Sequence, residues 1–109
     1  MEEKVIYEYF YRIGDNHFES VFELIVDKET DKMLYGVAVA GKNREYNWGR
    51  FSIHKDRLNK TKKVKRNNES LLRVQVEANS KEEADTKAGQ CLGDYLTEMA
   101  QRVFKMIEK

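Results

Sequence analysis

Hydrophobic and polar residues alternate in the first part of the chain with the period of a β-strand. Residues 5–13 (VIYEYFYRI) place Tyr7, Tyr9 and Tyr11 on one side and polar residues such as Glu8 on the other. Successive side chains of a strand point to opposite faces, and aromatic and β-branched residues favour strands. Similar alternation, or a short apolar run, predicts four more strands, at residues 18–26, 33–40, 46–53 and 71–78.

The strand predicted at residues 33–40 (MLYGVAVA) is apolar on both faces, which is typical of a central strand. One of its faces carries the small residues Gly36, Ala38 and Ala40. Small side chains let a neighbouring element approach closely. The pattern therefore predicts that a helix packs against this face.

After residue 79 the period changes to that of a helix. Ser80 followed by Glu83 forms a capping box, and apolar residues then recur at three- or four-residue spacing from Ala84 to Ile107. This pattern predicts a helix from about residue 81 to about residue 108, roughly 40 Å long at 1.5 Å per residue. A strand of eight or nine residues spans only about 30 Å, so the helix should extend beyond the sheet.

Together these elements predict one α+β domain over residues 1–109, which is a usual length for a single domain. The expected architecture is an antiparallel five-stranded meander over about residues 5–78. One long C-terminal helix, about residues 81–108, packs on one face and gives the order β-β-β-β-β-α. Short connections favour pairing between strands that are neighbours in the sequence.

Residues 54–70 (HKDRLNKTKKVKRNNES) follow neither period. They contain seven Lys or Arg residues, opposed only by Asp56 and Glu69. Two interpretations stay open. The segment is either a loop longer than most connections, or a hairpin arm extended from the last two predicted strands, with its turn near Asn67–Asn68.

Positive charge is concentrated around this segment. Residues 41–66 contain ten bases and two acids, whereas residues 1–40 contain nine acids and four bases. The whole chain nevertheless carries a net charge of only +1. Segregated charge of this kind predicts a positive field on one side of a nearly neutral molecule.

A basic segment beside aromatic side chains is typical of proteins that bind single-stranded nucleic acids. We therefore predict a small non-enzymatic accessory protein whose partner is nucleic acid, with single strands favoured. The candidate binding residues are Arg44, Trp48, Arg50, Lys55, Arg57, Lys60, Lys62, Lys63, Lys65 and Arg66. If their sheet face is uncovered, the tyrosines at positions 7, 9, 11 and 35 are further candidates for stacking on bases.

Two alternatives fit the same charge pattern. The lysines of residues 54–70 could serve only to keep a mobile loop solvated. The segment could also contact an acidic protein surface, which would make the chain a regulator or inhibitor that occupies a partner protein's surface.

Signals of catalysis are missing from the sequence. It contains no glycine-rich dinucleotide motif, no P-loop and no nucleophile elbow. Cys91 lies on the apolar stripe of the predicted helix and is expected to be a small core side chain rather than a nucleophile. His17 and His54 are not accompanied by cysteines or carboxylates at metal-ligand spacing. No catalytic residue, cofactor or metal is therefore expected.

The sequence also predicts a cytoplasmic protein that makes no membrane contact. No apolar run approaches the roughly 18 residues of a membrane-spanning helix, and the first residues do not form a signal peptide. The single cysteine cannot form an internal disulfide, which suits a reducing compartment.

The end of the predicted helix keeps its apolar residues beyond the expected edge of the sheet. These residues are Met99, Val103, Phe104, Met106 and Ile107. Two arrangements would cover them: a homodimer through the C-terminal helix, or a sheet that curls around the helix end within one chain.

Overall fold

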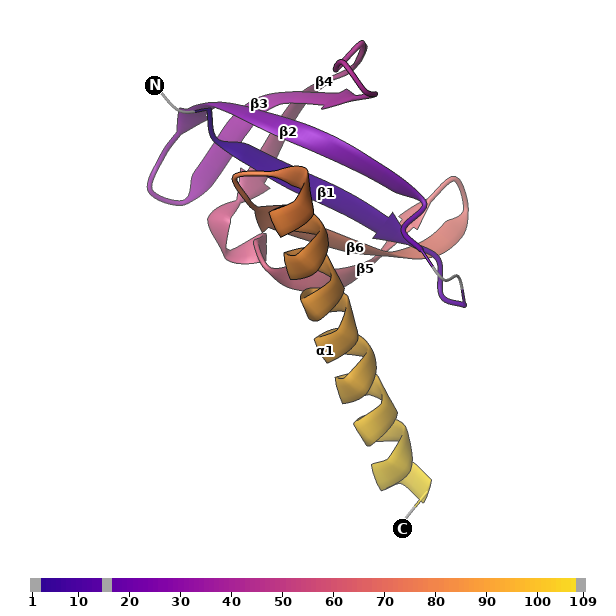
Figure 1. Cartoon of the computed structure of the whole chain (residues 1–109). Coiled ribbons are helices and arrows are strands. Elements are labelled where there is room, and N and C mark those ends of the chain that lie inside the picture. Colours follow the sequence, from indigo (N-terminus) through magenta and orange to yellow (C-terminus); the bar gives the residue numbers. More distant parts are fainter. Residues whose placement is uncertain (1–2, 15–16, 108–109) are drawn as a thin grey trace.

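The computed structural model describes residues 3–14 and 17–107 and shows an antiparallel sheet with a long helix against one face (Figure 1). The strands are β1 (Val5–Tyr11), β2 (Ser20–Glu29), β3 (Met33–Ala40), β4 (Tyr46–His54), β5 (Lys60–Arg66) and β6 (Glu69–Glu77). A short 3-10 helix, η1 (Lys55–Arg57), follows β4, and α1 (Lys81–Ile107) follows β6. The predicted α+β class is confirmed, with six strands instead of five. The predicted last helical position, Glu108, lies outside the described residues.

The additional strand, β5, comes from the basic segment. It pairs with β6 along its whole length, from Lys60 opposite Gln75 to Arg66 opposite Glu69. Asn67 and Asn68 connect the two strands, and both have positive φ angles of 52° and 66°. Two consecutive positive φ angles suit the tight turn of a two-residue hairpin, and asparagine tolerates them well. The basic segment therefore forms a hairpin within the sheet rather than a loop.

The strand order in the sheet is β4-β3-β2-β1-β6-β5, so the predicted meander holds only for the first four strands. β1 is central, with β2 on one side and β6 on the other. Tyr9, for example, lies opposite both Val21 and Val74. β4 and β5 follow one another in the chain, yet they form the two edges of the sheet.

The short connection between β4 and β5 requires the sheet to curl. The edges of a flat six-stranded sheet would be roughly 24 Å apart, at about 4.8 Å per strand interval. The path from residue 54 to residue 60 includes η1 and spans at most roughly 17 Å. Leu58 of this connection packs against Ile6, Leu24, Leu34 and Ile53. We call the sheet face that carries these four residues the concave face, and the face that α1 covers the convex face.

Helix α1 covers β1 and β6 on the convex face. Ala84 and Ala88 are fully buried and pack in one cluster with Tyr7, Tyr9 and neighbouring valines of β6. Because Tyr7 and Tyr9 are buried beneath the helix, they cannot stack on a ligand, and this part of the prediction is wrong.

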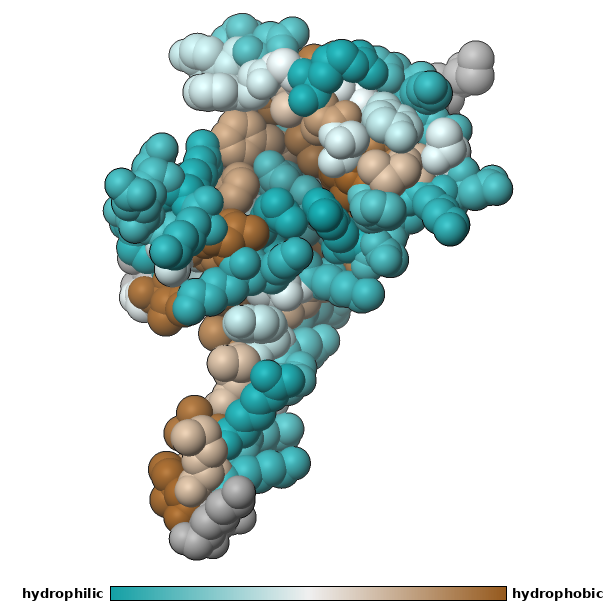
Figure 2. All heavy atoms as spheres, turned by 180° about the vertical axis from the view of Figure 1, so that it is seen from behind, coloured by the Kyte–Doolittle hydropathy of each residue, from teal (hydrophilic) through white to brown (hydrophobic). Residues whose placement is uncertain are grey.

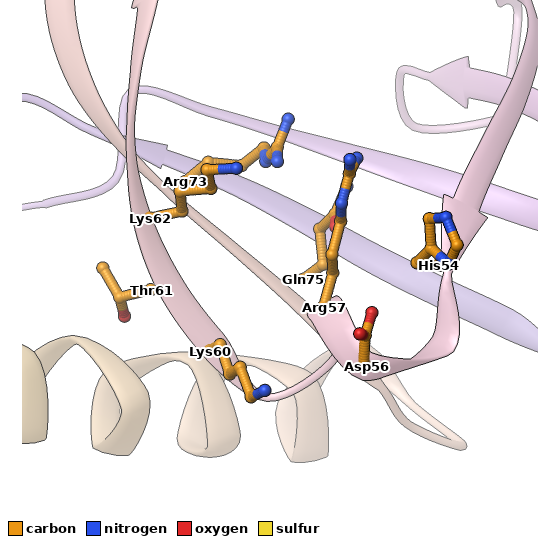
Figure 3. A pocket seen from close by; sticks show the side chains of 8 residues that line it. All are labelled: His54, Asp56, Arg57, Lys60, Thr61, Lys62, Arg73 and Gln75. Atoms are coloured by element: carbon orange, nitrogen blue, oxygen red, sulfur yellow. The ribbon is translucent and has the colours of Figure 1, made fainter. Parts of the chain in front are cut away.

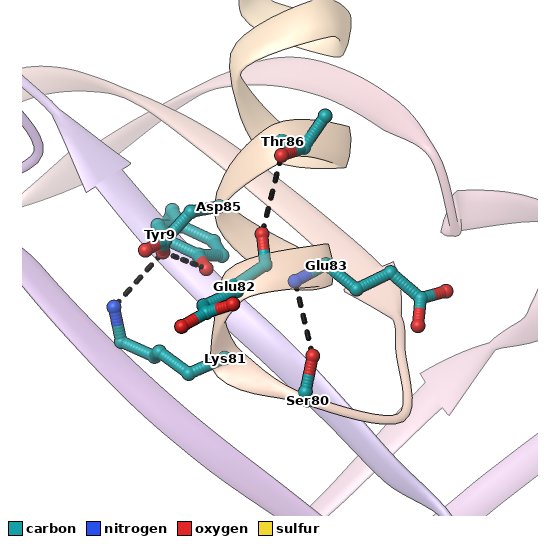
Figure 4. A network of polar contacts seen from close by, with 7 residues as sticks. All are labelled: Tyr9, Ser80, Lys81, Glu82, Glu83, Asp85 and Thr86. Carbon is teal, nitrogen blue, oxygen red and sulfur yellow. Dashed lines mark hydrogen bonds and ion pairs between the residues drawn. The ribbon is translucent and has the colours of Figure 1, made fainter.

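The start of α1 is fixed by polar contacts (Figure 4). The backbone N–H of Glu83 donates to the Ser80 hydroxyl at 3.2 Å, as the capping signal predicts. The hydroxyl of Tyr9 donates to the Asp85 carboxylate at 2.5 Å, and burial together with this hydrogen bond raises the tyrosine pKa. Lys81 contacts the same carboxylate at 2.9 Å. These contacts anchor the first turn of the helix to the central strand.

Gly36 and Ala38 of β3 do not face the helix, contrary to the prediction. Ala38 packs in the cluster on the concave face, and Gly36 lies opposite Phe51 of β4. A Cβ atom at Gly36 would lie 1.8 Å from the carbonyl oxygen of Ile25 and 2.9 Å from the Phe51 ring. The close neighbours of this glycine are therefore the backbone of β2 and an aromatic ring.

Beyond Leu92, α1 leaves the sheet and projects from the body of the molecule (Figure 1). The exposed fractions of Val103, Met106 and Ile107 are 52%, 75% and 71%. The interpretation in which the sheet curls around the helix end is therefore wrong. Among the described residues, no helix is both long enough and apolar enough to cross a membrane.

Candidate nucleic-acid interface

A pocket of about 420 Å³ opens between the end of β4, η1 and the β5–β6 hairpin (Figure 3). Its lining residues are His54, Asp56, Arg57, Lys60, Thr61, Lys62, Arg73 and Gln75. Four of them are Lys or Arg, and one is an acid. We call this site the basic pocket.

Strand geometry brings the cations of the basic pocket together. Lys60 and Lys62 are two positions apart in β5, so their side chains lie on the same face. Lys62 is directly opposite Arg73 of β6, and Arg57 approaches from η1 (Figure 3). Thr61 points the other way, toward the helix, where its hydroxyl donates to the Cys91 carbonyl at 3.0 Å.

Among the residues that the structure describes, the cations of the basic pocket have no ion-pair partner. None of Arg57, Lys60, Lys62 and Arg73 forms an ion pair with a carboxylate of residues 3–14 or 17–107. Like charges directly opposite in neighbouring strands destabilise a sheet, and Lys62 faces Arg73 in this way. A bound anion would relieve this repulsion.

A second pocket, of about 230 Å³, adjoins the basic pocket. Its lining residues are Glu8, Phe10, Phe22, Ala38, Trp48 and Arg66, and we call it the aromatic pocket. Trp48 is 63% exposed and meets the Phe22 ring edge-to-face, with ring centroids 5.9 Å apart. The Arg66 guanidinium lies over the Phe10 ring at 4.7 Å. Aromatic faces and cations are thus both present at this site.

The two pockets are joined by a hydrogen bond across the sheet. Gln75 of the basic pocket donates from Nε2 to the carboxylate of Glu8 in the aromatic pocket, at 2.6 Å. The register also places Phe10 of the aromatic pocket opposite Arg73 of the basic pocket. Seen from the side opposite to Figure 1, apolar side chains lie among hydrophilic ones over the sheet (Figure 2).

Three of the predicted binding residues are instead bound to carboxylates within the chain. Arg44 contacts Glu3 at 2.8 Å and Glu23 at 3.3 Å. These hydrogen bonds raise the pKa of Arg44. The arginine therefore serves to hold the turn after β3 against β2 and the start of β1.

Arg50 and Lys55 are held in the same way by acids of β2. Arg50 makes two hydrogen bonds of 2.9 Å to Asp27, and these bonds lower the pKa of the carboxyl group. Lys55 contacts Glu29 at 2.6 Å, and Glu29 also accepts from Lys4. The two lysines lower the pKa of Glu29 to about 2.

Two more predicted residues, Lys63 and Lys65, are exposed but lie on the opposite side of β5 from Lys60 and Lys62. The structure therefore brings together only Trp48, Arg57, Lys60, Lys62 and Arg66 of the predicted set. The basic pocket adds five residues that the sequence interpretation did not select, which are His54, Asp56, Thr61, Arg73 and Gln75.

The surroundings of Cys91 favour the protonated form of its thiol. The side chain is half-buried against the sheet, and burial together with the charge of Asp94 raises the pKa of its thiol. The protonated thiol is a poor nucleophile. Within the described ranges, no group of three His, Cys, Asp or Glu side chains is arranged to hold a metal ion.

Comparisons with known proteins found no matching family model, no similar curated protein and no similar solved structure.

Proposed function

We propose that this protein binds single-stranded nucleic acid on the concave face of its sheet, without catalysing a reaction. The observation that carries the proposal is the adjacency of two pockets. One is rich in cations that form no ion pair with the described carboxylates, and the other is lined by three aromatic rings, of which Trp48 is exposed. Single-strand binders combine these two features, because cations neutralise phosphates and rings stack on unpaired bases.

The basic pocket would hold the phosphates. Arg57, Lys60, Lys62 and Arg73 belong to three different elements and face one space, so they can contact successive phosphates. Contacts to phosphates do not depend on the base sequence of the nucleic acid. We therefore expect affinity that depends weakly on base sequence.

The aromatic pocket would hold the bases. Trp48 exposes most of its ring at the rim of the concave face. A base can stack on this ring only if it is unpaired and turned out of a helix, which favours single strands over duplexes.

A simpler role for the lysines of β5 also has physical support. β5 is an edge strand, and lysines on edge strands prevent pairing with other chains. This role does not account for Arg57 and Arg73, which lie outside β5 and still face the same pocket. The alternative partner, an acidic protein surface, would use the same cations but would not need the exposed ring of Trp48.

A matched pair of variants tests the proposal. Lys60→Glu with Lys62→Glu alters the concave face, and Lys63→Glu with Lys65→Glu makes the same charge change on the other face of the same strand. Binding of a labelled single-stranded oligonucleotide of about 20 nucleotides is measured by fluorescence anisotropy, for DNA and RNA. We expect the first variant to lose at least tenfold more affinity than the second, with both folded by circular dichroism.

Salt dependence gives a second measurement. About four phosphate contacts predict a slope near −3 in a plot of log affinity against log salt concentration, at about −0.7 per contact for a single strand. The Lys60→Glu, Lys62→Glu variant should reduce the magnitude of this slope by about 1.4. Equal losses in both variants would show that only net charge matters, and absent binding to any nucleic acid would favour the protein partner. Either outcome overturns the proposal.

We also propose a cytoplasmic site of action, because the cysteine content suits a reducing compartment. The thiol of Cys91 is the only one in the chain and cannot form an internal disulfide. Nucleic acid in single-stranded form is also available in that compartment.

A further inference from the structure

The projecting part of α1, residues 93–107, carries an apolar stripe that no other described part of the chain covers. At 100° per residue, the side chains of Leu96, Met99, Val103, Met106 and Ile107 fall within a sector of about 100°. Ala88 and Leu92, which pack on the sheet, belong to the same sector. The stripe that binds the sheet thus continues into solvent (Figure 2).

The exposed area is large enough to matter. Six large apolar side chains, including Phe104, are between 37% and 75% exposed on this part of the helix. With roughly 200 Å² for each full side chain, they present on the order of 600 Å². Monomeric proteins seldom expose more in one patch. Two copies would bury about 1,200 Å² together, the lower bound for a specific interface.

We propose that residues 93–107 of two copies of this chain pack together as an antiparallel helix pair, with a two-fold axis beside Ala100. This inference does not depend on nucleic-acid binding. A two-fold contact is self-complementary, so one apolar stripe supplies both sides of the interface.

The flanks of the stripe decide the orientation. One flank carries Glu98 and Arg102, which form an ion pair of 2.8 Å, and the other flank carries Ala100 and Phe104. In an antiparallel two-fold pair, each flank faces the same flank of the other copy. Glu98 then faces the partner's Arg102, and apolar residues face apolar residues. A parallel pair would instead place the charged flank against Phe104.

The length of the projecting segment fits the same arrangement. Residues 93–107 span about 22 Å, and Ala100 lies at their centre. With the axis there, the end of each helix reaches the point where the other helix meets its own sheet. The whole uncovered stripe is then used, and the small side chain of Ala100 allows close approach of the two helices.

Sedimentation velocity of the full chain between 1 and 100 µM tests the assembly. We expect a mass of twice 12.9 kDa at tens of micromolar. Met99→Glu with Val103→Glu should give a folded monomer, because neither residue belongs to the buried core. Gln90→Glu with Gln101→Glu makes the same charge change on the polar side of α1 and should remain dimeric. A single-chain mass for the wild type at 100 µM, or equal masses for the two variants, overturns the proposal.

A spin label tests the orientation. In a Cys91→Ala background, Gln90→Cys carries one nitroxide outside the contact. Antiparallel packing about Ala100 separates the two labels by about 30 Å along the helix axis, whereas parallel packing would keep them side by side. Pulsed electron spin resonance measures this distance. Labels found side by side would show a parallel dimer and contradict the proposed orientation.

Discussion

Two groups of basic side chains differ in what surrounds them. Arg44, Arg50 and Lys55 each contact a carboxylate of β2. Arg44 also contacts Glu3, which precedes β1. The cations of the basic pocket, Arg57, Lys60, Lys62 and Arg73, have no such contact with the described carboxylates. Equal charges in one short stretch of sequence thus have different roles.

The difference follows from the strand order. Three acids of β2, namely Glu23, Asp27 and Glu29, lie within reach of the cations on and around β4 and contact them. β5 is an edge strand whose sole neighbour in the sheet is β6. The residues of β6 that face Lys60 and Lys62 are Gln75 and Arg73. Topology therefore decides which cations are available to a ligand.

Neutralising the cations of the basic pocket and the carboxylate-bound cations in separate variants should produce the largest differences in affinity and stability. With Arg57, Lys60, Lys62 and Arg73 all changed to Gln, we expect affinity for a single-stranded oligonucleotide to fall by at least about 100-fold, because hydrogen bonds to charged groups are lost. The midpoint of thermal unfolding should not fall. With Arg44, Arg50 and Lys55 changed to Gln, affinity should stay within a few-fold and the midpoint should drop. The reverse pattern in anisotropy and thermal melts would refute the assignment.

Removing the exposed ring should have the next largest effect. Trp48→Ala should lower affinity by about tenfold, since stacking on one base contributes roughly 1–3 kcal/mol. Trp48→Phe keeps a ring and should lose much less. Trp48 is the one tryptophan of the chain, so quenching of its fluorescence by added oligonucleotide measures the contact directly. Unchanged fluorescence at saturation would place the bases elsewhere.

Reversing one cation of the facing pair should separate binding from stability. Arg73→Glu replaces the repulsion with Lys62 by an attraction, so we expect the free energy of unfolding to rise by about 0.5 kcal/mol while affinity falls. Arg73→Gln removes only the repulsion and should give a smaller gain. Urea unfolding measures both, and a loss of stability in Arg73→Glu would mean that the two side chains do not repel.

Acid titration should show the smallest effect, a change in stability with pH that comes from the carboxylate paired with Lys55. The pKa of Glu29 is lowered from 4.5 to about 2 by Lys4 and Lys55. Because the pKa is lower in the folded state, its stabilising contribution is present above about pH 4.5 and is lost as the pH falls toward 2. Glu29→Gln should remove this part of the pH dependence of unfolding. A side-chain resonance of Glu29 that titrates near pH 4.5 would contradict the paired geometry.

The sequence predicts elements well where one face is buried, and poorly where none is. Four of the predicted strands and the helix carry an apolar face that repeats with the correct period, whereas β4 is less regular and buries only Ile53. β5 (KTKKVKR) has Val64 as its single large apolar residue. This lysine-rich edge strand therefore shows no alternation of apolar and polar residues from which a strand could be predicted. The Asn67–Asn68 turn was the one local sign of this hairpin.

The site was only half predictable for a related reason. Pairing between β1 and β6 joins residues more than 60 positions apart and leaves no local signal. The sequence pattern identified Arg73 and Gln75 as outward positions of a strand. It did not show which residues of β1 and β5 lie beside them. Likewise, the period placed three tyrosines on one face of β1, whereas the choice of which face α1 covers depends on packing across the whole sheet.

The central position of β1 has a consequence for how the chain is made. Synthesis proceeds from the N-terminus, so β1 to β4 leave the ribosome before β6 and α1 do. Until residues 69–77 arrive, one edge of β1 has no partner, and the rings of Tyr7 and Tyr9 have no cover. Unpaired apolar edges of this kind are prone to aggregate, and distant pairing is slow. Folding is therefore held back until the last third of the chain has been translated, and a prematurely stopped chain would be a substrate for chaperones and proteases.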